Sequence, residues 1–88
     1  MENYNNASDF ALDLSFNFIK GRMKELKISQ KKLSTLIEVD ESTLIRNFKK
    51  DTEMSLRTYF KICGALQLRP YLVPAENDDT EMHRMHFN

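Results

Sequence analysis

Residues that make loops and disulfides are scarce in this 88-residue chain. It has two glycines, two prolines, one cysteine and no tryptophan. Few Gly and Pro favour an all-α fold. The lone cysteine, Cys63, excludes an internal disulfide, and we expect it to be a small core residue. No signal peptide is recognisable, and no apolar run reaches the roughly 20 residues of a transmembrane helix, so we expect a cytoplasmic protein without membrane contact.

A long first helix is predicted to start with a cap at Ser8 or Asp9 and to run to about Leu26, after a flexible segment at residues 1–8. One apolar stripe, spaced 4-3-4-3, should face the core: Leu12, Phe16, Ile19, Met23 and Leu26. A second stripe, rotated from the first, holds Phe10, Leu14 and Phe18. A helix with one buried face needs one stripe, so we expect another surface to cover the second.

Residues 29–50 are predicted to form two short helices joined by a tight turn. Ser29 can cap the first helix and Asp40 the second. The residues with helical spacing that should be buried are Leu33, Leu36, Ile37, Leu44 and Phe48. Neither helix is long enough to be stable alone, so the two must pack on each other and on the rest of the domain.

A fourth helix is predicted from a cap at Ser55 to about Gln67, because the residue before Pro70 avoids the helical conformation. Its core face should hold Leu56, Tyr59, Phe60, Cys63 and Leu66. A short extended segment follows at residues 71–73, and a polar, acidic tail occupies residues 76–88. We therefore expect one all-α domain, residues 9–75, built as a compact bundle of four to five helices.

The spacing within residues 29–50 resembles the helix-turn-helix of lambda-repressor-like, Cro-type (XRE-family) DNA-binding domains. The family's apolar positions are occupied by Leu33, Ile37, Val39 and Leu44. Ser34 stands where the family has a very small residue, and Gln30 where it often has Gln. The likeness continues through residues 54–68, with Leu56, Thr58, Ile62, Ala65 and Leu66 at matching positions. It implies that a recognition helix, residues 41–49, enters the major groove of double-stranded DNA.

Two residues depart from the family pattern. Glu38 holds the turn position usually occupied by Gly in a left-handed conformation, so we expect roughly 1 kcal/mol of strain there. Asn47 replaces an aliphatic residue, and Phe48 beside it can fill the space. The alternative to the resemblance is a helical hairpin inside an unrelated bundle.

The formal net charge is zero, but the charges are unevenly distributed. Residues 20–69 hold twelve Lys/Arg against six Asp/Glu, and residues 1–19 hold three Asp/Glu and no Lys/Arg. Residues 70–88 hold four Asp/Glu and one Arg. A polyanion responds to the local field within a Debye length of about 10 Å rather than to the whole-chain sum. This segregation is typical of a nucleic-acid-binding protein.

The candidate base-contacting residues follow from the helical spacing once Leu44 and Phe48 point inward. Those left facing outward, or nearly so, are Glu41, Ser42, Thr43, Ile45 and Arg46. Arg46 can bind guanine or a phosphate, and the hydroxyls of Ser42 and Thr43 can donate or accept hydrogen bonds. Glu41 can accept a hydrogen bond from the cytosine amino group, and Ile45 can touch a thymine methyl.

Backbone contacts are expected at the ends of both motif helices. Gln30, at the amino end of the first, can meet a phosphate together with the free amides of that turn. Lysines flank the same face and can contact phosphates: Lys31, Lys32, Lys49 and Lys50. Each of these residues also fits an ordinary solvated helix face.

No group of residues supports catalysis, so we expect neither an enzyme nor a cofactor. A Gly-rich phosphate loop, a Ser/His/Asp spacing and a cysteine cluster are all missing from the sequence. His83 and His86 could be two metal ligands on a helix, but no carboxylate or thiol set completes a site nearby, so no metal is expected.

Three functions agree with the sequence. The first is sequence-specific double-stranded DNA binding by a small transcriptional regulator. The second is the antitoxin of a toxin–antitoxin pair, in which the added N-terminal helix or the tail covers a toxin. The third is a helical protein-interaction module that has lost DNA binding.

A homodimer is also expected, because one recognition helix contacts too few base pairs for useful specificity. Surplus apolar surface for such a contact occurs on the second stripe of the first helix and near the C-terminal segment, at Leu68, Tyr71, Leu72 and Val73. In the alternative, the C-terminal segment lies across the first helix and the two surfaces cover each other.

Overall fold

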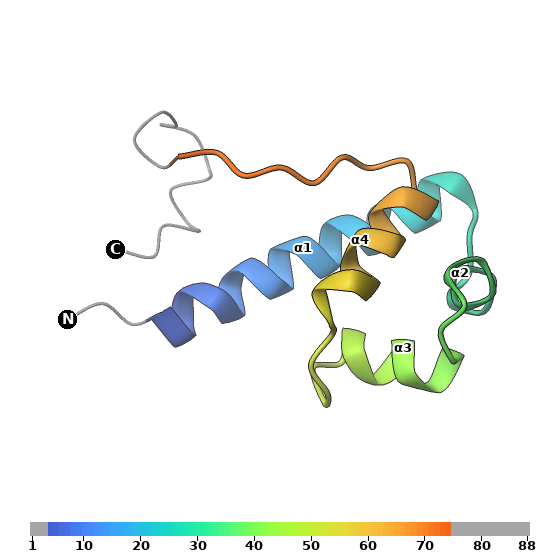
Figure 1. Cartoon of the computed structure of the whole chain (residues 1–88), viewed down its shortest axis with the longest axis horizontal. Helices are drawn as coiled ribbons and strands as arrows, with labels where there is room; N and C mark the ends of the chain where they lie inside the picture. Colours follow the sequence, from blue (N-terminus) through green and yellow to red (C-terminus); the bar gives the residue numbers. More distant parts are fainter. Residues whose placement is uncertain (1–3, 75–88) are drawn as a thin grey trace. The chain divides into compact units, whose positions relative to one another are not determined.

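Four helices and no strand are found in residues 4–74, the part of the chain that the computed structural model describes (Figure 1). They are α1 (Tyr4–Leu26), α2 (Gln30–Ile37), α3 (Glu41–Phe48) and α4 (Leu56–Ala65). The all-α prediction is confirmed for these residues. None of these helices combines the length and apolarity that a bilayer-spanning segment needs. The predicted acidic tail lies outside the described residues.

The chain divides into two units, which are considered separately. The first unit contains Met1–Phe18 together with Tyr71–Asn88, and the second contains Ile19–Pro70. Helix α1 therefore contributes its first part to one unit and its last part to the other.

Helix α1 begins at Tyr4, so the predicted cap at Ser8 or Asp9 and the predicted flexible segment up to Ser8 are wrong for residues 4–8. The Ser8 hydroxyl does not cap a helix start; it donates to the Asn5 carbonyl oxygen at 2.9 Å, one turn back within the helix. The predicted end at Leu26 is confirmed. The core stripe is also confirmed at Phe16, Ile19 and Met23, which are buried, while Leu12 and Leu26 are half-buried.

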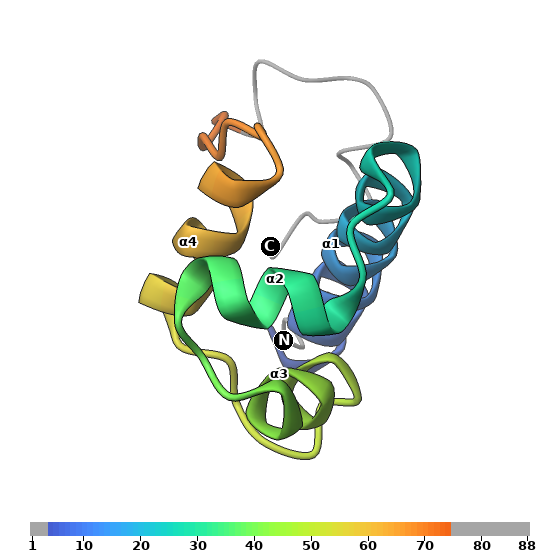
Figure 2. The same cartoon turned by 90° about the vertical axis from the view of Figure 1, so that its right-hand side faces the viewer.

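The core of the second unit receives side chains from all four helices. Helix α2 packs against both α3 and α4, and lies between them in Figure 2. The buried apolar residues are Ile19, Met23, Leu33, Ile37, Leu44, Phe48, Ile62, Cys63 and Leu66. Leu33, Leu44, Ile62 and Leu66 are each less than 2 % exposed, so these are the sites where a cavity would cost most. The predicted burial of Leu36 is wrong, because 49 % of this residue is exposed.

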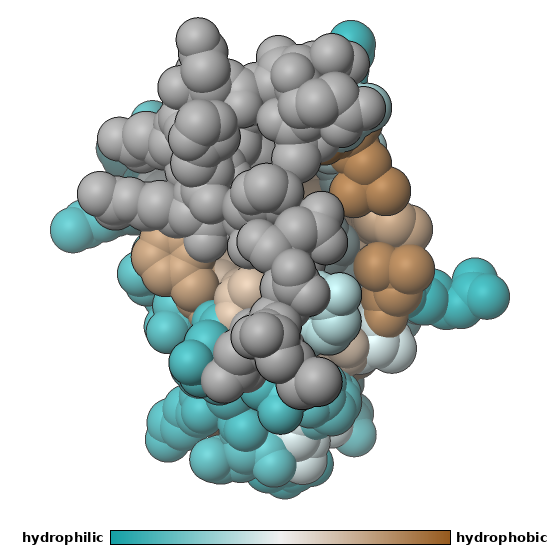
Figure 3. Space-filling model, turned by 90° about the vertical axis from the view of Figure 1, so that its left-hand side faces the viewer, coloured by the Kyte–Doolittle hydropathy of each residue, from teal (hydrophilic) through white to brown (hydrophobic). Residues whose placement is uncertain are grey.

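The predicted core face of α4 is partly wrong. Cys63 and Leu66 are buried and Tyr59 is half-buried, but Leu56 and Phe60 are 66 % and 49 % exposed. Apolar residues occur on more than one side of this helix, and packing against α2 selects the side that carries Ile62 instead. Apolar side chains thus remain at the surface in several places, including the face shown in Figure 3.

Each of the four helices ends in a left-handed residue that is not glycine. The four residues, with φ between 57° and 64°, are Lys27, Glu38, Lys50 and Gln67. In each case the next amide reaches back five residues along the helix; for example, the Leu68 N–H donates to the Cys63 carbonyl at 2.8 Å. This is the Schellman arrangement. It ends α4 at Ala65, before Pro70 can act, which corrects the predicted end near Gln67.

Candidate nucleic-acid interface

The amino end of α2 is held by Ser29, as predicted. Its hydroxyl oxygen accepts a hydrogen bond from the Lys32 amide at 3.0 Å, and Leu33 donates to the Ser29 carbonyl at 2.9 Å. The amides of Gln30 and Lys31 belong to the first turn, where helix geometry provides no carbonyl partner. Gln30 is half-buried, and both Lys31 and Lys32 are exposed. This end of α2 therefore presents amides and cations together.

The turn after α2 has the conformation that the resemblance implies. Glu38 is left-handed, with φ 59° and ψ 46°, and the Val39 amide donates to the Ser34 carbonyl at 3.1 Å. Ser34 is only 7 % exposed, and its hydroxyl donates to the Lys31 carbonyl at 2.7 Å. A larger residue at position 34 would need space that the packed interior does not offer.

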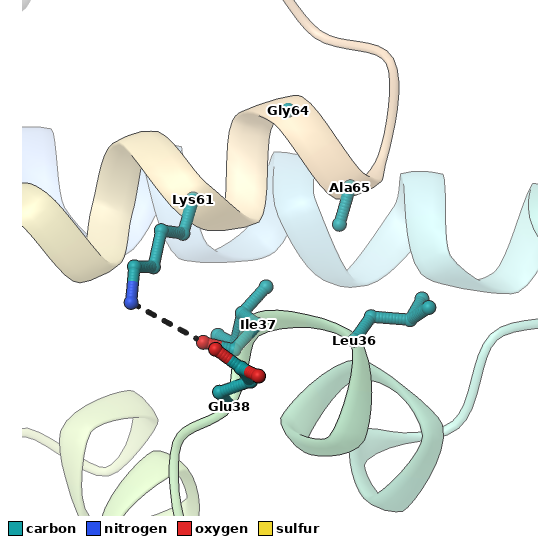
Figure 4. A pocket seen from close by; sticks show the side chains of 6 residues that line it. All are labelled: Leu36, Ile37, Glu38, Lys61, Gly64 and Ala65. Atoms are coloured by element: carbon teal, nitrogen blue, oxygen red, sulfur yellow. Dashed lines mark hydrogen bonds between the residues drawn. The ribbon is translucent and has the colours of Figure 1, made fainter.

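Helix α4 supports the same turn from the other side. The Lys61 ammonium group donates to the Ile37 carbonyl oxygen at 3.4 Å, close to the end of α2 (Figure 4). A cation there also faces the negative end of the helix dipole. Around this contact lies an open hollow of about 400 Å³, lined by Leu36, Ile37, Glu38, Lys61, Gly64 and Ala65. Lys61 therefore places a positive charge at the carboxyl end of α2.

Helix α3 presents a narrow polar face. Leu44, Asn47 and Phe48 are buried on one side, and Ser42 and Arg46, one turn apart, are exposed on the other. Glu41, Thr43 and Ile45 are half-buried along the margins. The intermediate position expected for Thr43 is confirmed, whereas Glu41 and Ile45 are less outward than predicted. The exposed face of α3 thus carries a hydroxyl and a guanidinium group.

The predicted side-chain cap at Asp40 is wrong. Asp40 precedes α3 with φ −56° and ψ 137°, and its carboxylate makes no capping hydrogen bond. The Leu44 amide still bonds to the Asp40 carbonyl at 3.0 Å, so the helix starts at the expected residue. The carboxylate does not occupy the first-turn amides of α3, which leaves them available to an external acceptor.

Asn47 stabilises the loop after α3, a role that the family resemblance did not predict. This residue is 5 % exposed, and its amide nitrogen donates to the Thr52 hydroxyl at 2.8 Å. The same nitrogen lies 3.4 Å from the carbonyl oxygens of Thr52 and Glu53. Asn47 therefore fixes the loop after α3, and Phe48 fills the neighbouring apolar space. The signal available in the sequence was an asparagine at a position where the family has an aliphatic residue, shortly before the polar loop at residues 51–53.

Cations lie near the carboxyl end of α3 as well. Lys49 and Lys50 are exposed, and Lys50 is one of the left-handed residues. From α1, the Lys20 ammonium lies 5.8 Å from the centre of the Phe48 ring, a cation–π distance that places another positive charge beside this helix.

Cys63 is a core residue, as expected. It is 3 % exposed, and burial raises the pKa of its thiol, an effect that a hydrogen bond with Tyr59 opposes. Within residues 4–74, no group of three His, Cys, Asp or Glu side chains is placed to hold a metal ion. The His83 and His86 pair lies outside the described residues.

The structure brings the sequence-predicted residues onto two helices that contact each other. Gln30, Lys31 and Lys32 lie on α2, and the remaining seven lie on α3 or directly after it.

Comparison with known proteins gives no match: no family model, no curated protein and no solved structure matches this chain.

Proposed function

We propose that this chain is a small transcriptional regulator that binds double-stranded DNA sequence-specifically through a lambda-repressor-like helix-turn-helix formed by α2 and α3. The observation that carries the proposal is the turn between these helices. A left-handed Glu38 directly follows α2, and the small residue Ser34 is buried at the contact side of α2. Both features are what the resemblance predicts at these two positions.

Helix α3 is the proposed recognition helix. Its exposed residues, Ser42 and Arg46, can donate to base edges in the major groove, and Arg46 can bind guanine with two hydrogen bonds. Thr43 and Ile45 lie beside them and can extend the contact to further bases. The carboxylate of Glu41, which is half-buried, repels phosphates, so it restricts the choice of sequence more than it adds affinity.

The proposed phosphate contacts come from both helices. The amides of the first turn of α2, with Gln30 beside them, form an anion-binding helix end, and Lys31 and Lys32 add positive charge. Lys49 and Lys50 do the same at the far end of α3. Such contacts position the protein on DNA, while the exposed face of α3 selects the sequence.

The experiment that tests this function is selection of bound duplexes from a random DNA pool, followed by affinity measurements at several salt concentrations. A regulator should enrich one sequence and bind it at least about 10³-fold more tightly than unrelated duplex. Its affinity should fall linearly with the logarithm of salt concentration, with a slope of about 0.9 per phosphate contact. Absence of both enrichment and salt dependence would favour the interaction module without DNA binding.

An antitoxin with the same DNA-binding domain is a second candidate. The exposed apolar segment after α4 favours it, because Tyr71 is 80 % exposed and Leu72 is 99 % exposed. A toxin-like reading frame beside the gene, whose product co-purifies with this chain, would distinguish an antitoxin from a solitary regulator.

A further inference from the structure

The first part of α1 carries an exposed apolar stripe in the first unit. It comprises Tyr4, Ala7, Ala11, Leu14 and Phe18, spaced 3-4-3-4 along the helix. Tyr4, Leu14 and Phe18 are 56 %, 41 % and 65 % exposed, and the two alanines are half-buried. Because α1 starts at Tyr4, this stripe is longer than the predicted one through Phe10, which is half-buried.

The spacing of the stripe is typical of a helix that packs along another helix. Apolar residues alternating by three and four keep one seam toward a partner helix over several turns. The stripe carries no charge: at about 100° per residue, Asp9 and Asp13 lie on the opposite side of α1, and both are exposed. Depletion of charge at the centre and exposed aromatic residues are features of protein–protein interfaces.

Two side chains of the C-terminal segment do not cover the stripe. Tyr71 and Leu72 belong to the same unit as the stripe and are 80 % and 99 % exposed, so neither is buried against α1.

The stripe complements itself in one orientation, because its two alanines precede its two large residues Leu14 and Phe18 along the helix. If two copies of α1 run antiparallel with position 11 opposite position 14 of the partner, then Ala11 faces Leu14 and Ala7 faces Phe18. By the two-fold symmetry, each of these two contacts occurs twice in the dimer. In a parallel pair, Phe18 would face Phe18 and Ala7 would face Ala7, which leaves collisions and gaps.

The helix dipoles favour the same orientation. An antiparallel pair opposes the two dipoles, whereas a parallel pair aligns them.

We propose that this chain forms a two-fold symmetric homodimer through an antiparallel α1–α1 contact, with Leu14 seated on the partner's Ala11 and Phe18 on the partner's Ala7. The inference goes beyond DNA binding and does not depend on it.

Sedimentation equilibrium of the full chain without DNA tests the contact. The parent should be dimeric in the micromolar range. Ala11→Glu and Leu14→Lys should each be monomeric, with a dimer dissociation constant raised at least about tenfold by a charge placed in an apolar seam. An equimolar mixture of the two variants should form a heterodimer, because the introduced glutamate of one chain lies opposite the introduced lysine of the other. Asp13→Asn, on the far side of α1, is the matched control and should stay dimeric.

Cysteine crosslinking provides a second measurement that does not require a charge in the seam. Chains with Ala11→Cys, mixed with chains with Leu14→Cys, should give a disulfide-linked heterodimer faster than either variant alone gives a homodimer. A parent that remains monomeric at several hundred micromolar would overturn the proposal. So would a charge-variant mixture that stays monomeric, or crosslinking that shows no preference for the mixed pair.

Discussion

The α2–α3 pair and the first part of α1 have similar apolar periodicity and opposite outcomes. In α2 and α3, most of the residues at helical spacing are buried, and both the preceding cap at Ser29 and the following left-handed turn at Glu38 are formed. In the first part of α1, Phe16 is buried while Leu14 and Phe18 remain exposed. Periodicity predicts that a helix has apolar sides, but only the number of available neighbours decides how many of those sides are buried.

The largest expected effect comes from removing a leucine from the first of these regions. Leu44 is fully buried, so Leu44→Ala should lower the free energy of unfolding by roughly 2–5 kcal/mol through lost burial and a cavity. Leu14→Ala, on the exposed stripe, should cost much less in the monomer. Urea denaturation at low protein concentration measures both. Equal losses in the free energy of unfolding for Leu44→Ala and Leu14→Ala would show that the two leucines contribute equally to stability, contrary to the proposed difference between the two regions.

The next effect concerns the exposed face of α3. Arg46→Ala should weaken binding to the selected duplex by about 1–3 kcal/mol if the guanidinium contacts a base, with unchanged circular dichroism. Arg57→Ala is the matched control, because Arg57 is an exposed arginine on α4 and lies outside the proposed interface. Fluorescence anisotropy with the selected duplex compares them. An equal loss for both variants would point to general electrostatics and not to a base contact.

Asn47→Ala tests whether a buried amide stabilises the end of the α2–α3 region. Loss of the 2.8 Å hydrogen bond leaves the Thr52 hydroxyl and the loop carbonyls without this donor, so unfolding should become easier by about 1–3 kcal/mol. Asn17→Ala, an exposed asparagine on α1, should change stability little. If thermal and chemical denaturation show the two variants to be equivalent, the loop is fixed by other contacts.

The smallest effect is expected at a helix end. Gln67 has φ 58°, a conformation that favours glycine, so Gln67→Gly should stabilise the protein by about 0.5–1 kcal/mol. Gln67→Ala keeps the Cβ atom and its strain at positive φ, so the free energy of unfolding should be close to that of the parent. A glycine variant that melts below the parent would show that the glutamine side chain contributes more than the strain costs.

The sequence by itself determined some of the local features of this protein, although the predicted caps at Ser8 or Asp9 and at Asp40 are not formed. The caps at Ser29 and Ser55 were predictable because a cap depends on neighbours within a few residues. The burial of Leu33 and Leu44 agrees with their helical spacing. The left-handed Glu38 was predictable from the family resemblance. The ten candidate DNA-binding residues, chosen from the family resemblance together with the helical spacing, lie on α2, on α3 and just after it.

Only the tertiary structure decided the choices that depend on distant neighbours. Leu36, Leu56 and Phe60 carry the same apolar signal as Ile62, yet packing of α2 against α4 buries Ile62 and exposes the other three. Asn47 became a structural residue because the following loop folds back onto its amide. Burial depends on the surface that lies opposite, and a one-dimensional pattern does not contain that information.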